Sequence, residues 1–200
     1  MVNIAVLTSG GGTNLEAILN AEERGDIKSG KVQIVIADRA GCYSLVRAEN
    51  HKKKNLLLNR KELGRKEFEK RLVETLICEK IDLIVLAGFL SILSEDFTEF
   101  YRDRIINIHP SLIPSFSGEG YYGLKVHEAA LKRGVKLTGA TVHLVNEIPD
   151  GGKILFQKAV EVKDGDTPEV LQKRVMEEAE WIILPMAVEY MADKIDKERV

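Results

Sequence analysis

Short apolar runs alternate with longer amphipathic stretches through the first half of the chain. Residues 3–8, 32–37 and 81–87 are the apolar runs, and the last is apolar at almost every position. Such runs are typical of strands covered on both faces of a parallel sheet. Between the first two runs, Leu15 and Leu19 recur at helical spacing. Strands that alternate with helices in this way predict an α/β protein with a doubly wound, mostly parallel sheet.

Two further helices are expected between these strands. One covers residues 43–52, and the other carries one apolar stripe formed by Phe68, Leu72, Leu76 and Ile77.

The pattern changes after this point. Residues 105–109 form a further short strand, which Pro110 ends. Residues 138–145 and 153–162 alternate between apolar and polar positions and are separated by a turn-rich loop. This alternation predicts an antiparallel pair, and therefore an antiparallel extension of the sheet in the C-terminal half.

The last helix has a clear start. Thr167 is placed as its N-cap and Pro168 at its first helical position. Pro185 is expected to kink this helix or divide it in two. Its apolar stripe is expected to consist of Leu171, Val175, Ala179, Ile182 and Met186.

Composition narrows the class of protein. The 200 residues contain no linker, repeat or low-complexity segment, so a single domain spanning residues 1–200 is expected. The 29 basic and 31 acidic residues give a net charge of −2, which argues against nucleic-acid or membrane binding driven by bulk charge. No apolar run approaches the roughly 20 residues of a membrane helix, and no secretory signal opens the chain. A cytoplasmic monomer or homodimer is expected.

No pattern points to a metal or a disulfide framework. Cys42 and Cys78 are far apart and form no C-x-x-C pair. No cluster of His, Cys and Asp has metal-ligand spacing, so no metal is expected.

A glycine-rich turn, residues 9–14, joins the first strand to the first helix. Glycines let the backbone approach an anion, and a helix start offers unpaired N–H groups, so Gly12, Thr13 and Asn14 are candidates for phosphate binding. A tight turn without a ligand is the alternative. Leu15 occupies the third glycine position of a dinucleotide fingerprint, which favours a monophosphate over NAD.

Asn107 and His109 lie two positions apart on a strand and therefore share one face. They stand at a strand end, where ligand crevices form in α/β sheets. An amide beside an imidazole can stabilise an oxyanion, and the imidazole can move a proton near neutral pH. The alternative is a structural pair that caps the sheet.

Asp150 lies in the loop 146–152 between the two antiparallel strands. From spacing alone, its Asp-Gly pair favours an ordinary turn residue. The alternative is a carboxylate turned toward His109, which would raise the pKa of that histidine. His143 is interpreted as a satisfied interior histidine.

Four segments in order give the chain a specific resemblance. It resembles the phosphoribosylglycinamide formyltransferase family from residue 3 to about residue 190, with the formyltransferase fold and its Rossmann-like N-terminal half. The segments are IAVLTSGGGTNLEAIL, LIVLAGFLSIL, IINIHPSLIPSF and TGATVHLVNEIPDGG.

The resemblance implies a reaction and roles for the catalytic candidates. The family transfers a formyl group from 10-formyltetrahydrofolate to the primary amine of glycinamide ribonucleotide, without a metal. Asn107 and His109 match the pair that stabilises the oxyanion, and His109 also matches the proton donor. Asp150 matches the aspartate that keeps this histidine charged and organises a water for proton relay. This match removes the preference for Asp150 as an ordinary turn residue.

The resemblance also implies binding residues. Gly12, Thr13 and Asn14 match the phosphate site, Glu180 matches the carboxylate that holds the ribose, and Thr141 matches a small hydroxyl residue near the catalytic centre. The folate is expected to contact Arg65, Leu90, Ser91, Ile92, Leu93, Asn107 and the loop 144–150.

The chain departs from the family pattern in three places. Residues 117–123 form a longer loop than many members have. Ser91 stands where an arginine is frequent. The last helix carries one extra residue before Glu180, which leaves Glu178 as the alternative ribose ligand.

The nearest alternative function is a formyltetrahydrofolate hydrolase, whose usual form has an additional N-terminal domain. A methionyl-tRNA formyltransferase would need a C-terminal tRNA-binding domain. Two more remote alternatives remain. A non-catalytic nucleotide-binding module would have no use for Asn107, His109 and Asp150. A Rossmann dehydrogenase is disfavoured by Leu15.

Overall fold

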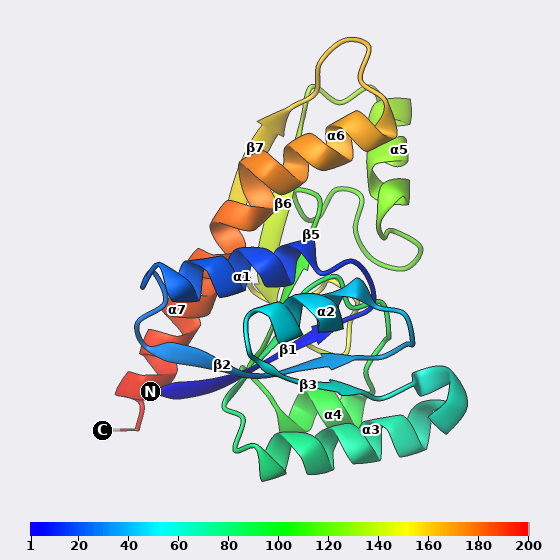
Figure 1. Cartoon of the computed structure of the whole chain (residues 1–200). Helices are drawn as coiled ribbons and strands as arrows, with labels where there is room; N and C mark the ends of the chain where they lie inside the picture. Colours follow the sequence, from blue (N-terminus) through cyan, green and yellow to red (C-terminus); the bar gives the residue numbers. More distant parts are fainter. Residues whose placement is uncertain (200) are drawn as a thin grey trace.

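A seven-stranded sheet runs through the molecule in the computed structural model, which describes residues 1–199 (Figure 1). Its strand order is β3-β2-β1-β4-β5-β6-β7. The strands are β1 (Val2–Thr8), β2 (Gly30–Ala37), β3 (Lys54–Leu57), β4 (Leu83–Leu86), β5 (Ile105–His109), β6 (Leu137–Leu144) and β7 (Ile154–Glu161). The first five pair in parallel, and β6 pairs antiparallel with both β5 and β7. The predicted parallel sheet with an antiparallel extension is confirmed.

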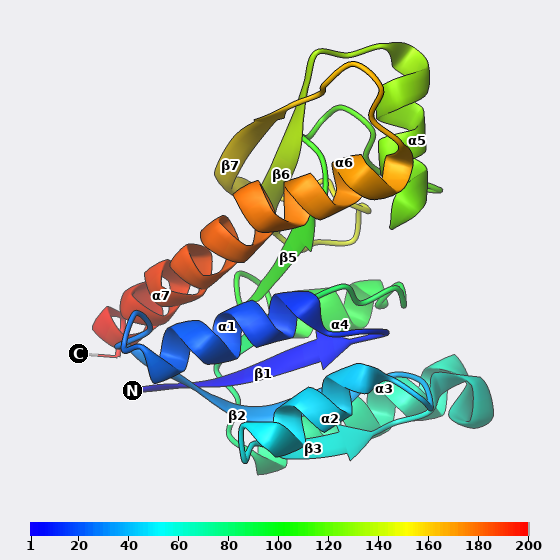
Figure 2. The ribbon, with the colours of Figure 1, turned by 45° about the horizontal axis from the view of Figure 1, so that its top comes forward.

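Helices cover both faces of the parallel part of the sheet (Figure 2). One core joins α1 and α7 to one face, and a second core joins α3 and α4 to the other. The helical elements are α1 (Thr13–Glu23), α2 (Tyr43–Asn50), α3 (Arg60–Cys78), α4 (Glu95–Phe100), α5 (Leu124–Arg133), α6 (Pro168–Val175), η1 (Met176–Glu180) and α7 (Trp181–Lys197). None of the helices described within residues 1–199 is long and apolar enough to cross a membrane.

The central strands send alternate side chains into the two cores. In β1, Ile4 and Val6 belong to the core under α1, whereas Ala5 and Leu7 belong to the core over α3. This explains why the runs are apolar at consecutive positions. The register between β1 and β2 shifts by one residue at Gln33, where a β-bulge lengthens β2.

The sequence patterns of two segments were interpreted incompletely. The short strand β3 was not expected, because four half-exposed edge residues show no alternation. The stripe of α3 is confirmed for Phe68, Leu72 and Leu76, which are buried, but it is wrong for Ile77, whose side chain is 58% exposed. The helix also breaks at Gly64, which has φ 74° and ψ 163°.

The last helix divides earlier than Pro185. Thr167 caps α6 and Pro168 occupies its first turn, as predicted. The five residues of η1 form a π-helix, and α7 then continues through Pro185. A π-turn holds one extra residue and rotates everything after it. The predicted stripe is therefore wrong beyond Ala179, because Ile182 and Met186 are exposed while Ile183 and Ala187 are buried.

The burial of α3 gives a direct test of the second core. We predict that Leu76→Ala lowers the free energy of unfolding by about 2–5 kcal/mol, because it leaves a cavity against the sheet. The neighbouring Ile77→Ala is the control and changes it by less than about 0.5 kcal/mol. Urea denaturation measures both values. Equal losses would contradict this assignment of the buried face.

Candidate active site

A cavity of about 770 Å³ opens at the carboxyl ends of β1, β4 and β5. Strand order reverses between β1 and β4, and such a reversal is where α/β sheets form ligand crevices. Its lining includes Leu86 and residues 88–93, residues 118–123 and residues 145–150. The cavity contains Asn107, His109, Asp150, Asn14 and Glu180, so the structure brings together the catalytic candidates and part of the expected nucleotide site.

The glycine turn leads directly into α1. Gly12 is the N-cap of this helix and has φ 74°. A Cβ at this position would lie 2.7 Å from the Cβ of Ser44, so both conformation and space require glycine. Thr13 and Asn14 line the cavity. No side chain caps the start of α1, which leaves its N–H groups for an anion.

The π-turn places Glu180 beside this turn. The Asn14 Nδ2 donates a hydrogen bond of 2.6 Å to Glu180 Oε2, and both side chains are buried. Burial raises the pKa of Glu180 to about 7, although the hydrogen bond from Asn14 acts in the opposite direction. Glu178 is exposed, so Glu180 is the glutamate that the extra residue of η1 brings into the cavity. Asn14 Oδ1 is buried and has no hydrogen-bond partner among the described residues.

Two histidines and a carboxylate form the centre of the cavity. Asp150 Oδ2 lies 3.4 Å from His109 Nδ1, and Asp150 Oδ1 lies 3.5 Å from His143 Nε2. Asn107 Nδ2 lies 3.2 Å from the same nitrogen of His143. The pairing of β5 with β6 causes this proximity, since it sets Asn107 directly opposite His143. His143 is therefore satisfied and interior, and it also belongs to this cluster.

Backbone groups fix the orientation of the cluster. His109 Nε2 donates to the Phe116 carbonyl at 2.8 Å, and His143 Nδ1 donates to the Leu144 carbonyl at 2.8 Å. The Gly118 N–H donates to Asp150 Oδ2 at 2.8 Å. Asp150 itself has φ 55°, a left-handed conformation that aspartate tolerates in turns. The loop after His109 therefore touches both that histidine and Asp150.

Burial controls the electrostatics of this pair. Burial lowers the pKa of His109, and it outweighs the opposite effect of Asp150. The expectation that Asp150 raises the pKa of His109 has the right sign for that contact, but the overall shift is downward because the imidazole is desolvated. Burial also raises the pKa of Asp150, yet His143 and His109 together hold it below its ordinary value.

Both ring nitrogens of His109 face hydrogen-bond acceptors. A neutral imidazole has only one N–H, so one of the two contacts, to Phe116 or to Asp150, lacks a proton in the neutral form. The protonated ring satisfies both. Burial therefore favours the neutral form of His109, whereas the Phe116 carbonyl and the Asp150 carboxylate are placed to accept hydrogen bonds from the protonated form.

The residues expected to bind folate fall into two groups. Leu90, Ser91, Ile92 and Leu93 line the cavity, as does the loop from Val145 to Asp150. Arg65 does not line it: its side chain is 52% exposed and its Nε lies 3.4 Å from Glu69 Oε1.

Thr141 supports the site from outside the cavity. Its hydroxyl donates to the Ser111 carbonyl at 2.7 Å and accepts from the Ile113 N–H at 3.1 Å. These two bonds hold the start of the loop that follows His109.

Arg39 and His127 are among the residues near the site that sequence reasoning missed. Arg39 lines the cavity, but its sequence neighbours show no motif that would have marked it. His127 of α5 is fully buried, and neither ring nitrogen has a hydrogen-bond partner among the described residues. Burial lowers the pKa of His127 to about 4, and repulsion from the protonated form of the nearby His109 acts in the same direction. A histidine inside an amphipathic helix gives no sequence signal for such proximity.

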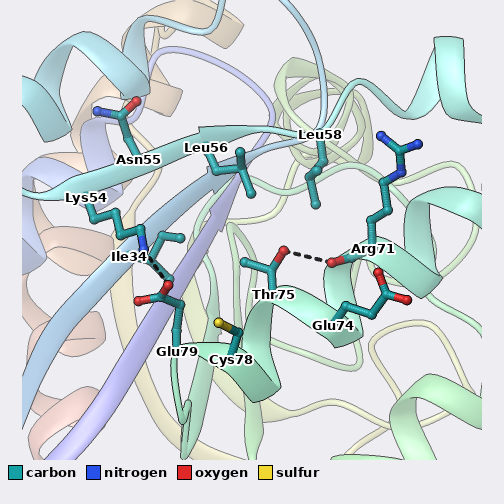
Figure 3. A pocket seen from close by; sticks show the side chains of 10 residues that line it. All are labelled: Ile34, Lys54, Asn55, Leu56, Leu58, Arg71, Glu74, Thr75, Cys78 and Glu79. Atoms are coloured by element: carbon teal, nitrogen blue, oxygen red, sulfur yellow. Dashed lines mark hydrogen bonds and ion pairs between the residues drawn. The ribbon is translucent and has the colours of Figure 1, made fainter.

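A second cavity of about 390 Å³ lies at the far edge of the sheet, between β3 and α3 (Figure 3). It contains Cys78 and a Lys54–Glu79 ion pair, and no histidine lines it. It is remote from the catalytic candidates. Within residues 1–199, no group of three or more His, Cys, Asp or Glu side chains is arranged to hold a metal ion.

The fold and the polar cluster at the strand ends define a doubly wound α/β protein with an active-site crevice. Residues 2–188 match the sequence profile of the formyl transferases. The chain therefore belongs to the formyl transferase family.

Individual relatives agree with this assignment. A phosphoribosylglycinamide formyltransferase of Haemophilus influenzae is 38% identical over 96% of this chain and 88% of its own length. The trifunctional purine biosynthetic protein adenosine-3 of Gallus gallus is 41% identical over 96% of this chain, which spans only 18% of that protein. The crystal structure of glycinamide ribonucleotide transformylase 1 from Symbiobacterium toebii has a TM-score of 0.90 and 40% identity, and the match covers 97% of this chain and 89% of that one.

The raised pKa of Glu180 gives a stability test. Its pKa of about 7 in the folded protein exceeds its ordinary value of 4.5, so its contribution to stability is present below pH 4.5 and is lost as pH rises through 7. We predict that Glu180→Gln is more stable than the natural chain at pH 8 by roughly 1–3 kcal/mol, because no buried charge forms.

Denaturant unfolding of both proteins between pH 4.5 and pH 8 measures this difference. The advantage of the glutamine variant should disappear toward pH 4.5. Parallel pH profiles would show that Glu180 is not a buried, ionising carboxylate.

Proposed function

We propose that this protein transfers the formyl group of 10-formyltetrahydrofolate to the primary amine of glycinamide ribonucleotide, a step of purine biosynthesis. The single observation that carries the proposal is the cluster of Asn107, His109 and Asp150 inside the large cavity. Membership of the formyl transferase family and the phosphoribosylglycinamide formyltransferases among the relatives support it.

The reaction needs stabilisation of one negative charge. The amine of the nucleotide attacks the formyl carbon, a C–N bond forms, and negative charge develops on the formyl oxygen. Asn107 supplies an amide N–H. His109 supplies its Nε2–H, which donates to the Phe116 carbonyl in the free protein and must exchange this acceptor for the formyl oxygen. Donors of this kind stabilise an oxyanion in a site that excludes water. Burial of His109 strengthens this interaction, because the surroundings have a low dielectric constant.

The reaction also needs one proton to move. The attacking amine loses a proton, the bond between the formyl carbon and N10 of the folate breaks, and N10 gains a proton. Burial lowers the pKa of His109, and the neutral ring that donates from Nε2 has its lone pair on Nδ1, beside Asp150, where it can accept a proton near neutral pH. The carboxylate of Asp150, 3.4 Å away, then stabilises the imidazolium until the proton passes to N10.

The nucleotide and the folate are assigned to opposite parts of the cavity. We place the phosphate at Gly12, Thr13 and the start of α1, where N–H groups are unpaired. The ribose hydroxyls are assigned to Glu180, which Asn14 orients. The folate is assigned to Asn107, the segment Leu90–Leu93 and the loop 145–150, with Arg65 outside the cavity wall.

The alternative is hydrolysis of 10-formyltetrahydrofolate, in which water replaces the amine. Both reactions release tetrahydrofolate, so an absorbance assay with and without glycinamide ribonucleotide distinguishes them. We expect turnover only when the nucleotide is present. Turnover without the nucleotide would favour the hydrolase, and no turnover in either case would overturn both.

The roles of the cluster predict severe losses of rate. His109→Ala and Asp150→Asn should each lower the single-turnover rate by about 10²–10⁴-fold, since each removes the acid–base or oxyanion function. Binding of both substrates should change little. Asp164→Asn is the control, because that carboxylate is fully exposed and lies in a remote turn. A near-normal rate for Asp150→Asn would show that Asp150 has no catalytic role and is only a turn residue.

The phosphate assignment predicts a selective binding defect. Gly12→Val should raise the nucleotide KM by about 10-fold or more and the folate KM by much less, because the new side chain displaces Ser44 and the start of α1. Gly25→Ala is the control, since Gly25 has φ 78° but open space around it. Steady-state kinetics measures both constants, and an equal rise in both would contradict the assignment.

A further inference from the structure

Arg39 is the only lysine or arginine among the described residues that line the large cavity. The other charged lining residues, Glu119, Glu147, Asp150 and Glu180, are acidic. Both substrates of the proposed reaction are anions: the nucleotide carries a phosphate, and the folate carries the carboxylates of its glutamate. An anion that enters an acidic cavity needs a cation to offset the repulsion, and Arg39 is the side chain in place to supply it.

Two contacts hold the Arg39 guanidinium in position. Its Nε lies 3.1 Å from Asp38 Oδ1, and its Nη2 lies 3.5 Å from Asp38 Oδ2. Within residues 1–199, its Nη1 makes no hydrogen bond. The Arg39 side chain is 48% exposed, whereas the Asp38 side chain is 1% exposed. A buried carboxylate thus orients a guanidinium whose far side is open to a ligand.

Ser91 completes the arrangement from another strand end. The Ser91 Oγ donates a hydrogen bond of 2.5 Å to Asp38 Oδ2, and both side chains are buried. Ser91 belongs to the segment after β4, whereas Asp38 and Arg39 follow β2. The bond therefore ties Arg39 to the Leu90–Leu93 wall of the cavity, which is the wall assigned to the folate.

The hydrogen bond from Ser91 to Asp38 also explains the serine at position 91. An arginine is frequent there in the family that the chain resembles, and serine provides no charge. In this chain the serine instead binds the aspartate that orients Arg39, so the cation enters the cavity from the loop after β2.

We infer that Arg39 binds a glutamate carboxylate of the folate, and that Asp38 and Ser91 are its positioning residues. This inference rests on the proposed function. The guanidinium suits a carboxylate because its remaining N–H groups can form charge-assisted hydrogen bonds with both oxygens. Arg65, half-exposed and beside Glu69, is secondary in this account.

Steady-state kinetics of Arg39→Ala tests the inference. We expect the folate KM to rise about 10- to 100-fold, as for loss of a charge-assisted hydrogen bond, with kcat and the nucleotide KM within about threefold of normal. Arg39→Lys should recover part of the loss. Arg24→Ala is the control, since Arg24 pairs with Asp26 on the surface, away from the cavity. Arg65→Ala should have a smaller effect than Arg39→Ala.

A second variant separates positioning from structure. Ser91→Ala should raise the folate KM by about 2- to 10-fold in the natural background and leave it unchanged in the Arg39→Ala background, because the Ser91 hydroxyl is bonded to Asp38 and acts through the arginine, while the backbone at position 91 is retained in the variant. Additive effects would overturn the positioning role.

Binding measurements keep this inference separate from the proposed function. Calorimetric titration with folic acid, and with the pteroyl amide that lacks the glutamate, requires no turnover. Arg39→Ala should weaken folic acid and leave the amide unaffected. Equal weakening of both compounds, no change in either, or a rise in the nucleotide KM instead would overturn the inference. An inactive natural enzyme that still shows this difference would overturn only the proposed function.

Discussion

The carboxylate of Asp150 lies within 3.5 Å of two buried histidines, and the geometry of the whole site depends on this contact. A buried carboxylate is costly unless charges and hydrogen bonds compensate it. Here His109, His143 and the Gly118 N–H provide the compensation. The antiparallel part of the sheet makes the contact possible, because β6 carries His143 opposite β5 and the β6–β7 connection returns Asp150 over both strands.

The same contact connects the loops of the site to rigid elements. Asn107 and His109 lie on β5 in the middle of the sheet, and the loop from Phe116 to Gly118 binds both His109 and Asp150. A site built on strands keeps its geometry more exactly than one built on loops alone. The loop after Asp150 also packs tightly against β6. A Cβ on Gly152 would lie 1.7 Å from the Leu144 carbonyl oxygen, so only glycine fits at this position.

Much of this could be predicted from the sequence, because the information is local or carried by motifs. Apolar runs identified the central strands, and the face shared by Asn107 and His109 followed from strand geometry. Ile182 and Met186 could not be placed, since a π-turn breaks the helical period without changing residue type. Arg39 could not be found because its significance depends on the bond between Asp38 and Ser91, which are distant in sequence from one another. The downward shift in the pKa of His109 needed the burial of the folded chain.

The electrostatic link between Asp150 and His109 is the central claim, and an NMR titration of the His109 ring tests it most directly. Burial lowers the pKa of His109 and Asp150 partly offsets this. The natural chain should therefore show a His109 pKa below 6.5, and Asp150→Asn should lower it further. An unchanged or higher His109 pKa in the variant would contradict the account.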